Sequence, residues 1–285
     1  MGVKNRCEIF RNDFFVHICI KRNNVVFLSN TNERNNIVIM RKILIFLMLM
    51  SFAGLKAQNV QLHYDLGHSL YGDLSNRPSA TTTVEMFKPD RWGNTFLFTD
   101  IDYFHDGAAG AYWEISRELN IWRDNMRWAF HLEYDGGLES SQLHEKSTRY
   151  QHAALVGGAW NWASVNFDRT LSLQALYKYY FKGQNPWNRP FNSFQATAVW
   201  GILFADHLLS FSGFIDCWYD QSVRGHWVTV AEPQLWLNIN ALRGCSDVRL
   251  SIGTEVEVSN NFVFDKNGRN DRFYAIPTIA AKWTF

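Results

Sequence analysis

The last thirteen residues of the chain alternate between apolar positions and a mixed set. Every second residue from Phe273 to Phe285 is apolar, including Ile279 and Trp283, whereas the other phase carries Lys282 and two threonines. A period of two is the pattern of a β-strand, and about 9–11 residues let a tilted strand cross a bilayer. A terminal strand that ends in phenylalanine is typical of bacterial outer-membrane β-barrels, although a strand of a soluble sandwich shows the same alternation.

The same period recurs along the rest of the chain. We predict strands at residues 60–67, 81–87, 95–103, 112–119, 126–135, 149–162, 171–181, 194–203, 208–219, 227–237, 248–259 and 273–285. The phase of 149–162 is ambiguous. About twelve strands is an even number, as single-chain bacterial barrels require. The longer connections mostly follow odd-numbered strands, which predicts that both termini are periplasmic. The expected fold is an all-β, antiparallel transmembrane β-barrel.

Composition agrees with a wall that is apolar outside and polar inside. Hydrophobic residues make up 47% of the chain, yet its mean hydropathy is only −0.23. Aromatic residues reach 16%, with 12 tryptophans, as the aromatic girdles of a barrel would use. The net charge of +1 gives no signal for a nucleic-acid polymer as partner.

A secretory signal peptide is predicted at residues 40–57. Arg41 and Lys42 follow Met40, residues 43–52 form the apolar h-region, and we place cleavage after Ala57. The apolar run is too short for a transmembrane helix. Residues 1–39 are then expected to be unstructured or mistranslated upstream sequence, with an unusually long n-region as the alternative. The barrel domain would cover residues 58–285, and the protein would locate to the cell outer membrane.

The cysteines give no sign of a disulfide or a metal site. Of the 4 cysteines, Cys7 and Cys19 precede the signal peptide, and Cys217 and Cys245 lie in different predicted hairpins. No C-x-x-C spacing is present. We expect Cys217 and Cys245 not to pair, and no metal or other cofactor is implied.

One phase of the predicted strands is rich in charge. An arginine or lysine facing lipid near the midplane costs about 2–4 kcal/mol, so these side chains should face inward. The candidates for a solute-binding inner surface are drawn from this phase, and they include the aromatic Trp218 beside the polar side chains: Asp100, Asp102, Glu114, Arg127, His131, Glu133, Lys178, Asp216, Trp218, Glu232, Arg249, Glu255 and Glu257. A salt-bridged plug that merely fills the barrel is the alternative.

Enzyme motifs of soluble folds, such as a Walker loop, H-E-x-x-H or G-x-S-x-G, do not occur. We therefore expect a non-enzyme. One alternative is a rim protease of the omptin kind, because Asp100 and Asp102 lie close to His105. The Asp-x-His pair that such enzymes also need is not obvious here.

Six segments resemble the Tsx-like nucleoside-specific channel-forming proteins, and more closely an uncharacterised branch of that group. These segments are residues 82–93, 111–118, 194–201, 211–216, 232–236 and 277–285. The resemblance covers essentially all of the chain after the signal peptide. It implies a twelve-stranded barrel that passes nucleosides passively, with aromatic and charged side chains as ligands.

We therefore predict a substrate-selective passive channel for nucleosides or similar small polar solutes. Inward aromatic rings such as Phe98, Phe214 or Trp218 could stack on a base. The expected partners are outer-membrane lipid, the solute, and the barrel-assembly machinery through the strand ending at Phe285. A structural or interaction barrel with a closed interior is the rival from another class.

Overall fold

The computed structural model describes residues 17–21, 24–28, 58–105, 107–120, 127–139, 151–183, 189–221 and 226–285. The chain divides into two compact units, Met1–Lys56 and Ala57–Phe285. In the first unit, β1 (His17–Lys21) pairs with β2 (Asn24–Leu28) as an antiparallel hairpin. The predicted signal peptide lies outside the described residues, so its cleavage stays a prediction.

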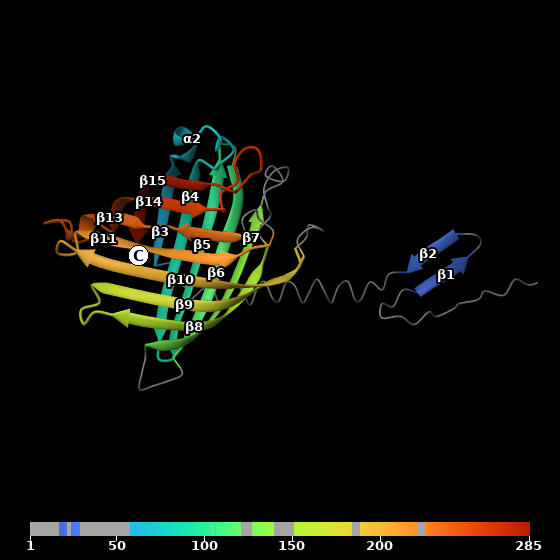
Figure 1. The fold of residues 1–285 in the computed structure, drawn as a ribbon, viewed down its shortest axis with the longest axis horizontal. Helices are drawn as coiled ribbons and strands as arrows, with labels where there is room; N and C mark the ends of the chain where they lie inside the picture. Colours follow the sequence, from blue (N-terminus) through green and yellow to red (C-terminus); the bar gives the residue numbers. More distant parts are fainter. Residues whose placement is uncertain are drawn as a thin grey trace, which may run out of the picture. The chain divides into compact units, whose positions relative to one another are not determined.

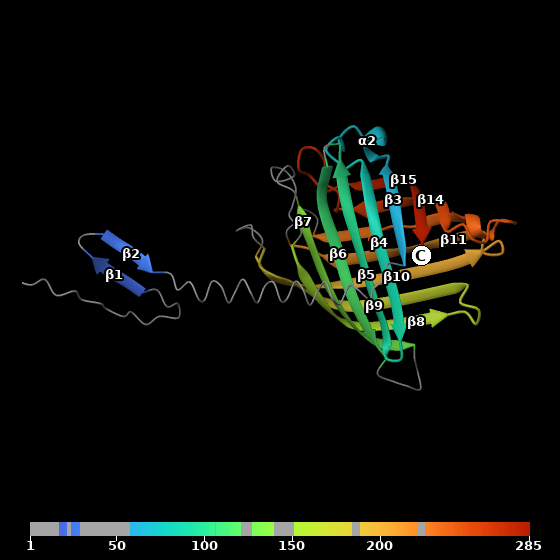
Figure 2. The same ribbon diagram turned by 180° about the vertical axis from the view of Figure 1, so that it is seen from behind.

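The second unit is a closed antiparallel β-barrel (Figures 1 and 2). Its strands are β3 (Asn59–Asp65), β4 (Ala80–Asp90), β5 (Gly93–Phe104), β6 (Gly107–Leu119), β7 (Trp128–Glu139), β8 (Ala153–Ala163), β9 (Arg169–Tyr180), β10 (Phe191–Phe204), β11 (Leu209–Tyr219), β12 (Trp227–Ala231), β13 (Gln234–Asn238), β14 (Leu250–Asn260) and β15 (Phe273–Thr284). Neighbours in sequence pair around the wall, and β15 pairs with β3 to close it.

The barrel wall has twelve strand positions, because β12 and β13 share one. Both pair with β11 on one side and with β14 on the other. Pro233 lies between them and has no N–H to donate to a ladder, so the strand predicted at 227–237 is interrupted there. The predicted fold class and strand number are confirmed.

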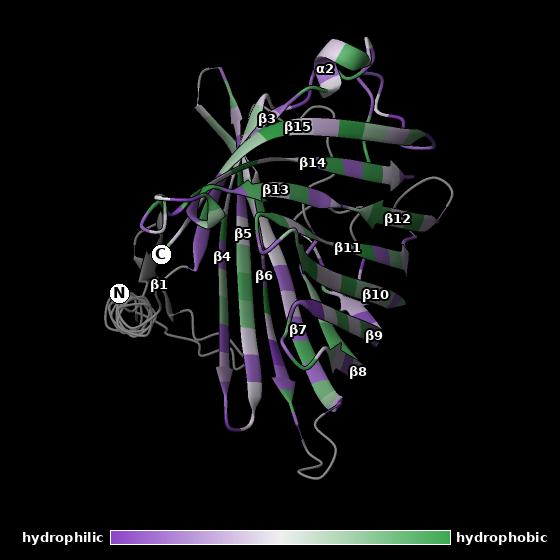
Figure 3. Cartoon of the chain, turned by 90° about the vertical axis from the view of Figure 1, so that its left-hand side faces the viewer, coloured by the Kyte–Doolittle hydropathy of each residue, from purple (hydrophilic) through white to green (hydrophobic). Residues whose placement is uncertain are grey.

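Hydrophilic and hydrophobic residues alternate along the strands of the barrel (Figure 3). On β3, Leu62 and Tyr64 are 55% and 51% exposed, whereas Gln61 and His63 are 1% and 3% exposed. Successive side chains of a strand point to opposite faces. The buried polar phase therefore faces the interior, and the apolar phase faces outward.

The structure corrects the start of one predicted strand and resolves the phase of another. We predicted that a strand begins at residue 112, but β6 begins at Gly107 and its pairing with β5 starts at that residue. The ambiguous strand at 149–162 is β8, in which Leu155 and Ala159 are buried and Val156 is exposed.

Among the residues that the structure describes, helix occurs in two short segments of the connections. They are α2 (Gly67–Leu70) and the 3₁₀ turn η2 (Ile239–Ala241). In the described ranges, no helix is both long and apolar enough to span a membrane.

The two ends of this unit meet at one rim. The Phe285 N–H donates to the Gln58 carbonyl at 3.0 Å. The strands whose ends meet at this rim are separated in the sequence by residues 91–92, 120–127, 164–168, 205–208 and 239–249. The strands whose ends meet at the other rim are separated by residues 66–79, 105–106, 140–152, 181–190, 220–226 and 261–272. The predicted sorting of long and short connections thus holds apart from 105–106 and 239–249. A periplasmic location of the termini stays a prediction.

The connections 66–79 and 261–272 pack together at the rim opposite the chain ends. Leu74 from the first is fully buried in a cluster with Val263, Tyr274 and Ile276. The Asp265 carboxylate holds the second connection in shape by accepting the backbone N–H groups of Asn267 and Arg269 at 2.8 and 2.9 Å.

Candidate functional site

Acidic side chains dominate the polar phase of the wall. We call this set the inner acidic face. It consists of Asp65, Glu85, Asp100, Asp102, Glu114, Glu118, Glu133, Asp135, Asp216, Glu232, Glu255 and Glu257. Cross-strand register places them on one side of the sheet, and Glu232 lies in the break between β12 and β13. Glu232 shares the inward phase of Val230, which pairs with Asp216, and of Gln234, which pairs with Glu255.

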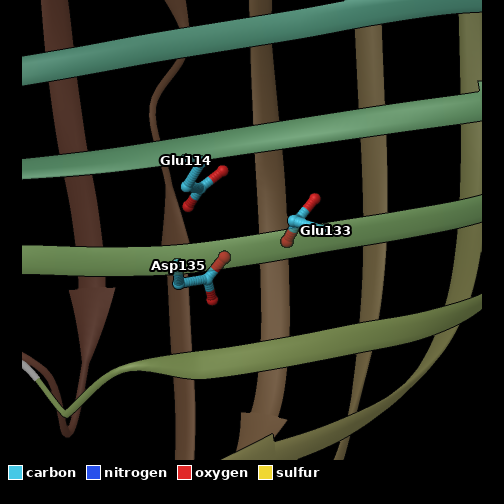
Figure 4. A group of neighbouring side chains, drawn as sticks. All are labelled: Glu114, Glu133 and Asp135. Atoms are coloured by element: carbon cyan, nitrogen blue, oxygen red, sulfur yellow. The ribbon is translucent and has the colours of Figure 1, made fainter. Parts of the chain in front are cut away.

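Three of these carboxylates gather on β6 and β7. One oxygen each of Glu114, Glu133 and Asp135 lies within 4.8 Å of the others (Figure 4). Register explains the arrangement, because Glu114 is opposite Asp135 and Glu133 is two residues away on the same face. We call this trio the carboxylate cluster. It holds oxygen ligands of the kind that hard cations prefer.

A lysine lies beside this cluster. The Lys178 Nζ is 2.9 Å from Asp135 Oδ2 and donates to Gln195 at 2.8 Å. The same ammonium lies 5.2 and 5.3 Å from the ring centroids of Tyr180 and Trp218. A charge and two aromatic faces therefore occur together on the inner wall.

Towards the rim where the chain ends meet, His131 joins two acidic residues. Its Nε2 is 2.9 Å from Glu133 Oε2, and its Nδ1 is 3.5 Å from Glu118 Oε1. The amides of Asn94 and Asn161 donate to the other Glu118 oxygen at 2.9 and 2.7 Å. Glu118 is thereby used by the wall itself, and it is less available to a solute than Glu133.

Trp236 fills part of the interior near β14. It is fully buried, its Nε1 donates to Gln234 at 3.0 Å, and Lys282 Nζ lies 4.2 Å from its ring centroid. A Cβ on Gly253 would come within 2.6 Å of this indole, so only glycine leaves room for it. Gln234 also donates to Glu255 at 2.6 Å.

The connection 66–79 contributes a cation to the interior. Arg77 Nε lies 2.7 Å from Asp65 Oδ2, and its Nη2 donates to Glu257. This connection is therefore tied to β3 and β14 at once. Glu257, which we predicted as a solute ligand, is an ion-pair partner of the protein's own loop.

Most of the predicted site residues do face inward. Asp100 and Asp102 accept from Thr83 and Thr81, at 2.5 and 2.6 Å, so the two carboxylates of the rim-protease alternative are bound to neighbouring threonines. Asp216 accepts from Thr197 in the same way.

Two predicted residues lie at the rim where the chain ends meet. Arg127 and Arg249 are exposed and come just before β7 and β14 begin. Their carbonyls accept backbone N–H groups from Asn161 and Thr284 at 2.7 and 2.9 Å, so both residues still share the inward phase of their strands. A role in solute binding stays a prediction for both.

Three residues that shape the interior were not among the predicted solute ligands. Asp135 was expected to face inward with His131 and Glu133, and that phase could have placed it in the candidate set. Trp236 lies two residues after Gln234 in an inward phase. Arg77 carried no signal, because it belongs to a polar connection without periodicity.

Sequence comparison places the chain in a family of unestablished role. The family described as "Domain of unknown function (DUF5020)" matches residues 57–285. The chain belongs to the DUF5020 family. This match does not confirm the resemblance to Tsx-like channels, which stays a prediction. No curated protein matches the sequence.

Solved structures show where the fold of this DUF5020 chain recurs. The NanC porin matches with a TM-score of 0.50 and 11% identity, over 80% of this chain and 99% of that one. The KdgM porin matches with a TM-score of 0.43 and 10% identity, over 80% of this chain and 98% of that one. LpxR from Salmonella typhimurium matches with a TM-score of 0.42 and 9% identity, over 80% of this chain and 99% of that one. Similarity to NanC at this identity concerns the barrel fold alone.

Proposed function

We propose that this protein is an outer-membrane barrel that passes small polar solutes passively. The observation that carries the proposal is the inverted wall, in which exposed apolar side chains surround a buried polar face. In water, that arrangement would leave a large apolar surface exposed, whereas in a bilayer it is the stable one. NanC, which shares the barrel fold, is a porin, and the proposal assigns the same class of role here.

Nucleosides are the solutes we propose first. Besides the Tsx-like segments, the interior offers what a flat base and a polyol need. Phe98 and Tyr112 face inward with ring centroids 5.9 Å apart, and Trp218 lies beside Lys178. Aromatic faces can stack on a base, and the carboxylates can accept hydrogen bonds from ribose hydroxyls. Weak contacts at several places would let a solute leave as well as enter.

Liposome swelling tests this proposal. Vesicles with the refolded barrel should swell faster in nucleosides than in sugars of matched size, and vesicles without protein should not. Equal swelling rates in both solutes would support a channel and contradict the preference for nucleosides. No swelling in any small solute would contradict the channel.

The rival function is a structural or interaction barrel with a closed interior, and one observation favours it. Arg77 carries the connection 66–79 into the polar interior and binds Asp65 and Glu257 there. If this contact is permanent and continues across the barrel, the interior is filled. The swelling measurement separates the two functions.

Assembly and location follow from the same proposal. We expect the barrel to lie in outer-membrane lipid and the assembly machinery to bind the terminal strand through Phe285. Cleavage near Ala57 would precede insertion. Amino-terminal sequencing of protein recovered from outer membranes checks the last point, and a retained Cys7 would contradict it.

A further inference from the structure

The charges that face the interior are strongly unbalanced. Along the wall, in the described ranges, the inner acidic face is opposed by three side chains with permanent positive charge: Lys178 and Lys282 from the strands and Arg77 from a connection. Arg127 and Arg249 lie at the rim where the chain ends meet, and both are exposed there. The whole chain, by contrast, has a net charge of +1. The negative charge is thus concentrated on the face that a solute would meet.

The three cations are already engaged by the protein. Arg77 binds Asp65 and Glu257, and Lys178 binds Asp135. The Lys282 ammonium lies over the Trp236 ring. These cations therefore offset part of the acidic charge and present little free positive charge to a passing anion.

Some acidic oxygens, in contrast, have no partner. Asp135 is only 4% exposed, and its Oδ1 has no hydrogen-bond partner among the residues that the structure describes. The same holds for Oε1 of Glu133, whose side chain is 8% exposed. Buried carboxylate oxygens without partners are costly unless a cation or water satisfies them. Both residues belong to the carboxylate cluster.

We propose that the barrel interior selects for cations, and that Glu114, Glu133 and Asp135 form the site where the cationic group of a passing solute binds. The proposal rests on the proposed channel function and specifies its substrate class. Solutes that carry a metal-ion or ammonium charge are favoured, neutral polyols pass, and acidic sugars or nucleotides are disfavoured.

The physical reason is the field of a one-sign surface inside a low-dielectric wall. Such a surface raises the local concentration of counter-ions and repels co-ions. The effect depends on salt, since the Debye length falls from about 10 Å at 0.1 M to about 3 Å at 1 M ionic strength. Selectivity should therefore weaken as salt rises, which selection by pore size would not do.

The test is the reversal potential of the refolded barrel in a planar bilayer under a KCl gradient. We expect K⁺ to permeate several-fold better than Cl⁻ at 0.1 M salt and this preference to shrink at 1 M. If the barrel conducts and the K⁺ to Cl⁻ permeability ratio is one or below, cation selectivity is contradicted but the channel function is not. A barrel that never conducts overturns the channel as well, so the two failures are distinguishable.

Two variants locate the site. Glu133→Gln and Glu114→Gln should each lower the K⁺ to Cl⁻ ratio clearly, because each removes one charge from the carboxylate cluster. Asp247→Asn is the matched control, since it removes one charge from an exposed position in the connection 239–249. An equal loss in the control and in both cluster variants would overturn the site. The ratio of the unmodified barrel tests selectivity whether or not a variant folds.

Discussion

Arg77 and Asp65 are joined by a 2.7 Å contact between Nε and Oδ2, which ties a loop to the inner wall of the barrel. The second partner of Arg77, Glu257, lies on a different strand. A connection that sequence patterns describe only as polar thus becomes part of the interior. Whether it obstructs that interior is a question that single substitutions can answer.

Loss of charge at Glu257 should destabilise the barrel more than the same change at Glu255. Glu257→Gln leaves the Arg77 guanidinium with one carboxylate, whereas Glu255 accepts from the neutral amide of Gln234 at 2.6 Å. The difference in unfolding free energy should be roughly 1–3 kcal/mol. Urea unfolding of the two variants in the same lipid measures it. Equal midpoints would mean that the Arg77 contact contributes nothing.

Releasing the loop should raise solute flux if the interior is otherwise open. Arg77→Ala removes both ion pairs that hold the connection 66–79 inside. Arg272→Ala is the control, since it breaks a pair with Asp73 at a more exposed place between two connections. Swelling rates should rise for the first variant and change little for the second. An unchanged rate in Arg77→Ala would show that the loop does not limit passage.

The outward position of Ile252 makes a charge there expensive. This side chain is 50% exposed, in the apolar phase of β14. Ile252→Arg should cost about 2–4 kcal/mol if the position lies near the bilayer midplane, and Ile252→Leu should cost little. Folding yield in lipid vesicles, scored by heat-modifiable migration on cold gels, compares them. Equal yields for both variants would argue against a lipid-facing wall.

The loop at 261–272 should loosen in acid. Backbone N–H donors from Arg269 and Asn267 hold the pKa of Asp265 at about 2, below its ordinary 3.8. The carboxylate's contribution is complete above the ordinary pKa and is lost as pH falls towards 2. Amide hydrogen exchange in this loop should therefore be slow at pH 5 and accelerate near pH 2, beyond the intrinsic pH effect. Asp265→Asn should show the loosened loop already at pH 5, and a loop equally protected in the variant would refute this account.

Removal of Phe285 should block assembly without reducing synthesis. Its ring is 60% exposed one residue past the end of β15, in phase with the outward Trp283. Phe273→Ala is the control, because Phe273 lies on the same face near the other end of β15 and is 65% exposed. Outer-membrane fractions should contain the control and lack the deletion. Normal heat-modifiable barrel after deletion would count against recognition of the terminal ring.

Alternation alone predicted the wall of this barrel. On β7, exposed Trp128 and Phe130 alternate with buried Ala129 and His131, as the sequence pattern required. Successive side chains of a strand face either the apolar outside or the polar interior, so the alternation of apolar and polar residues on β7 is strong. On β8 it is weak, because small and apolar residues such as Ala153 and Leu155 are also used inside.

The side chains of the interior could be predicted only where they belong to strands. The phase of Glu133 and Glu255 follows from counting along a strand, but Arg77 reaches Glu257 across a large separation in sequence. No local pattern encodes such a contact. Counting also assigns a phase to Arg127 and Arg249, but it does not show that they lie at the rim just outside β7 and β14.

The hydrogen bond from Phe285 to Gln58 also means that this ring of strands has no privileged starting point. A short peptide linker could join the two residues, and the chain could be reopened in the tight turn at 205–208, as circular permutation allows. The permuted polypeptide would keep every cross-strand neighbour and lose only its terminal phenylalanine. It would therefore separate the strand pairing that shapes the barrel from the terminal residue that we propose the assembly machinery recognises.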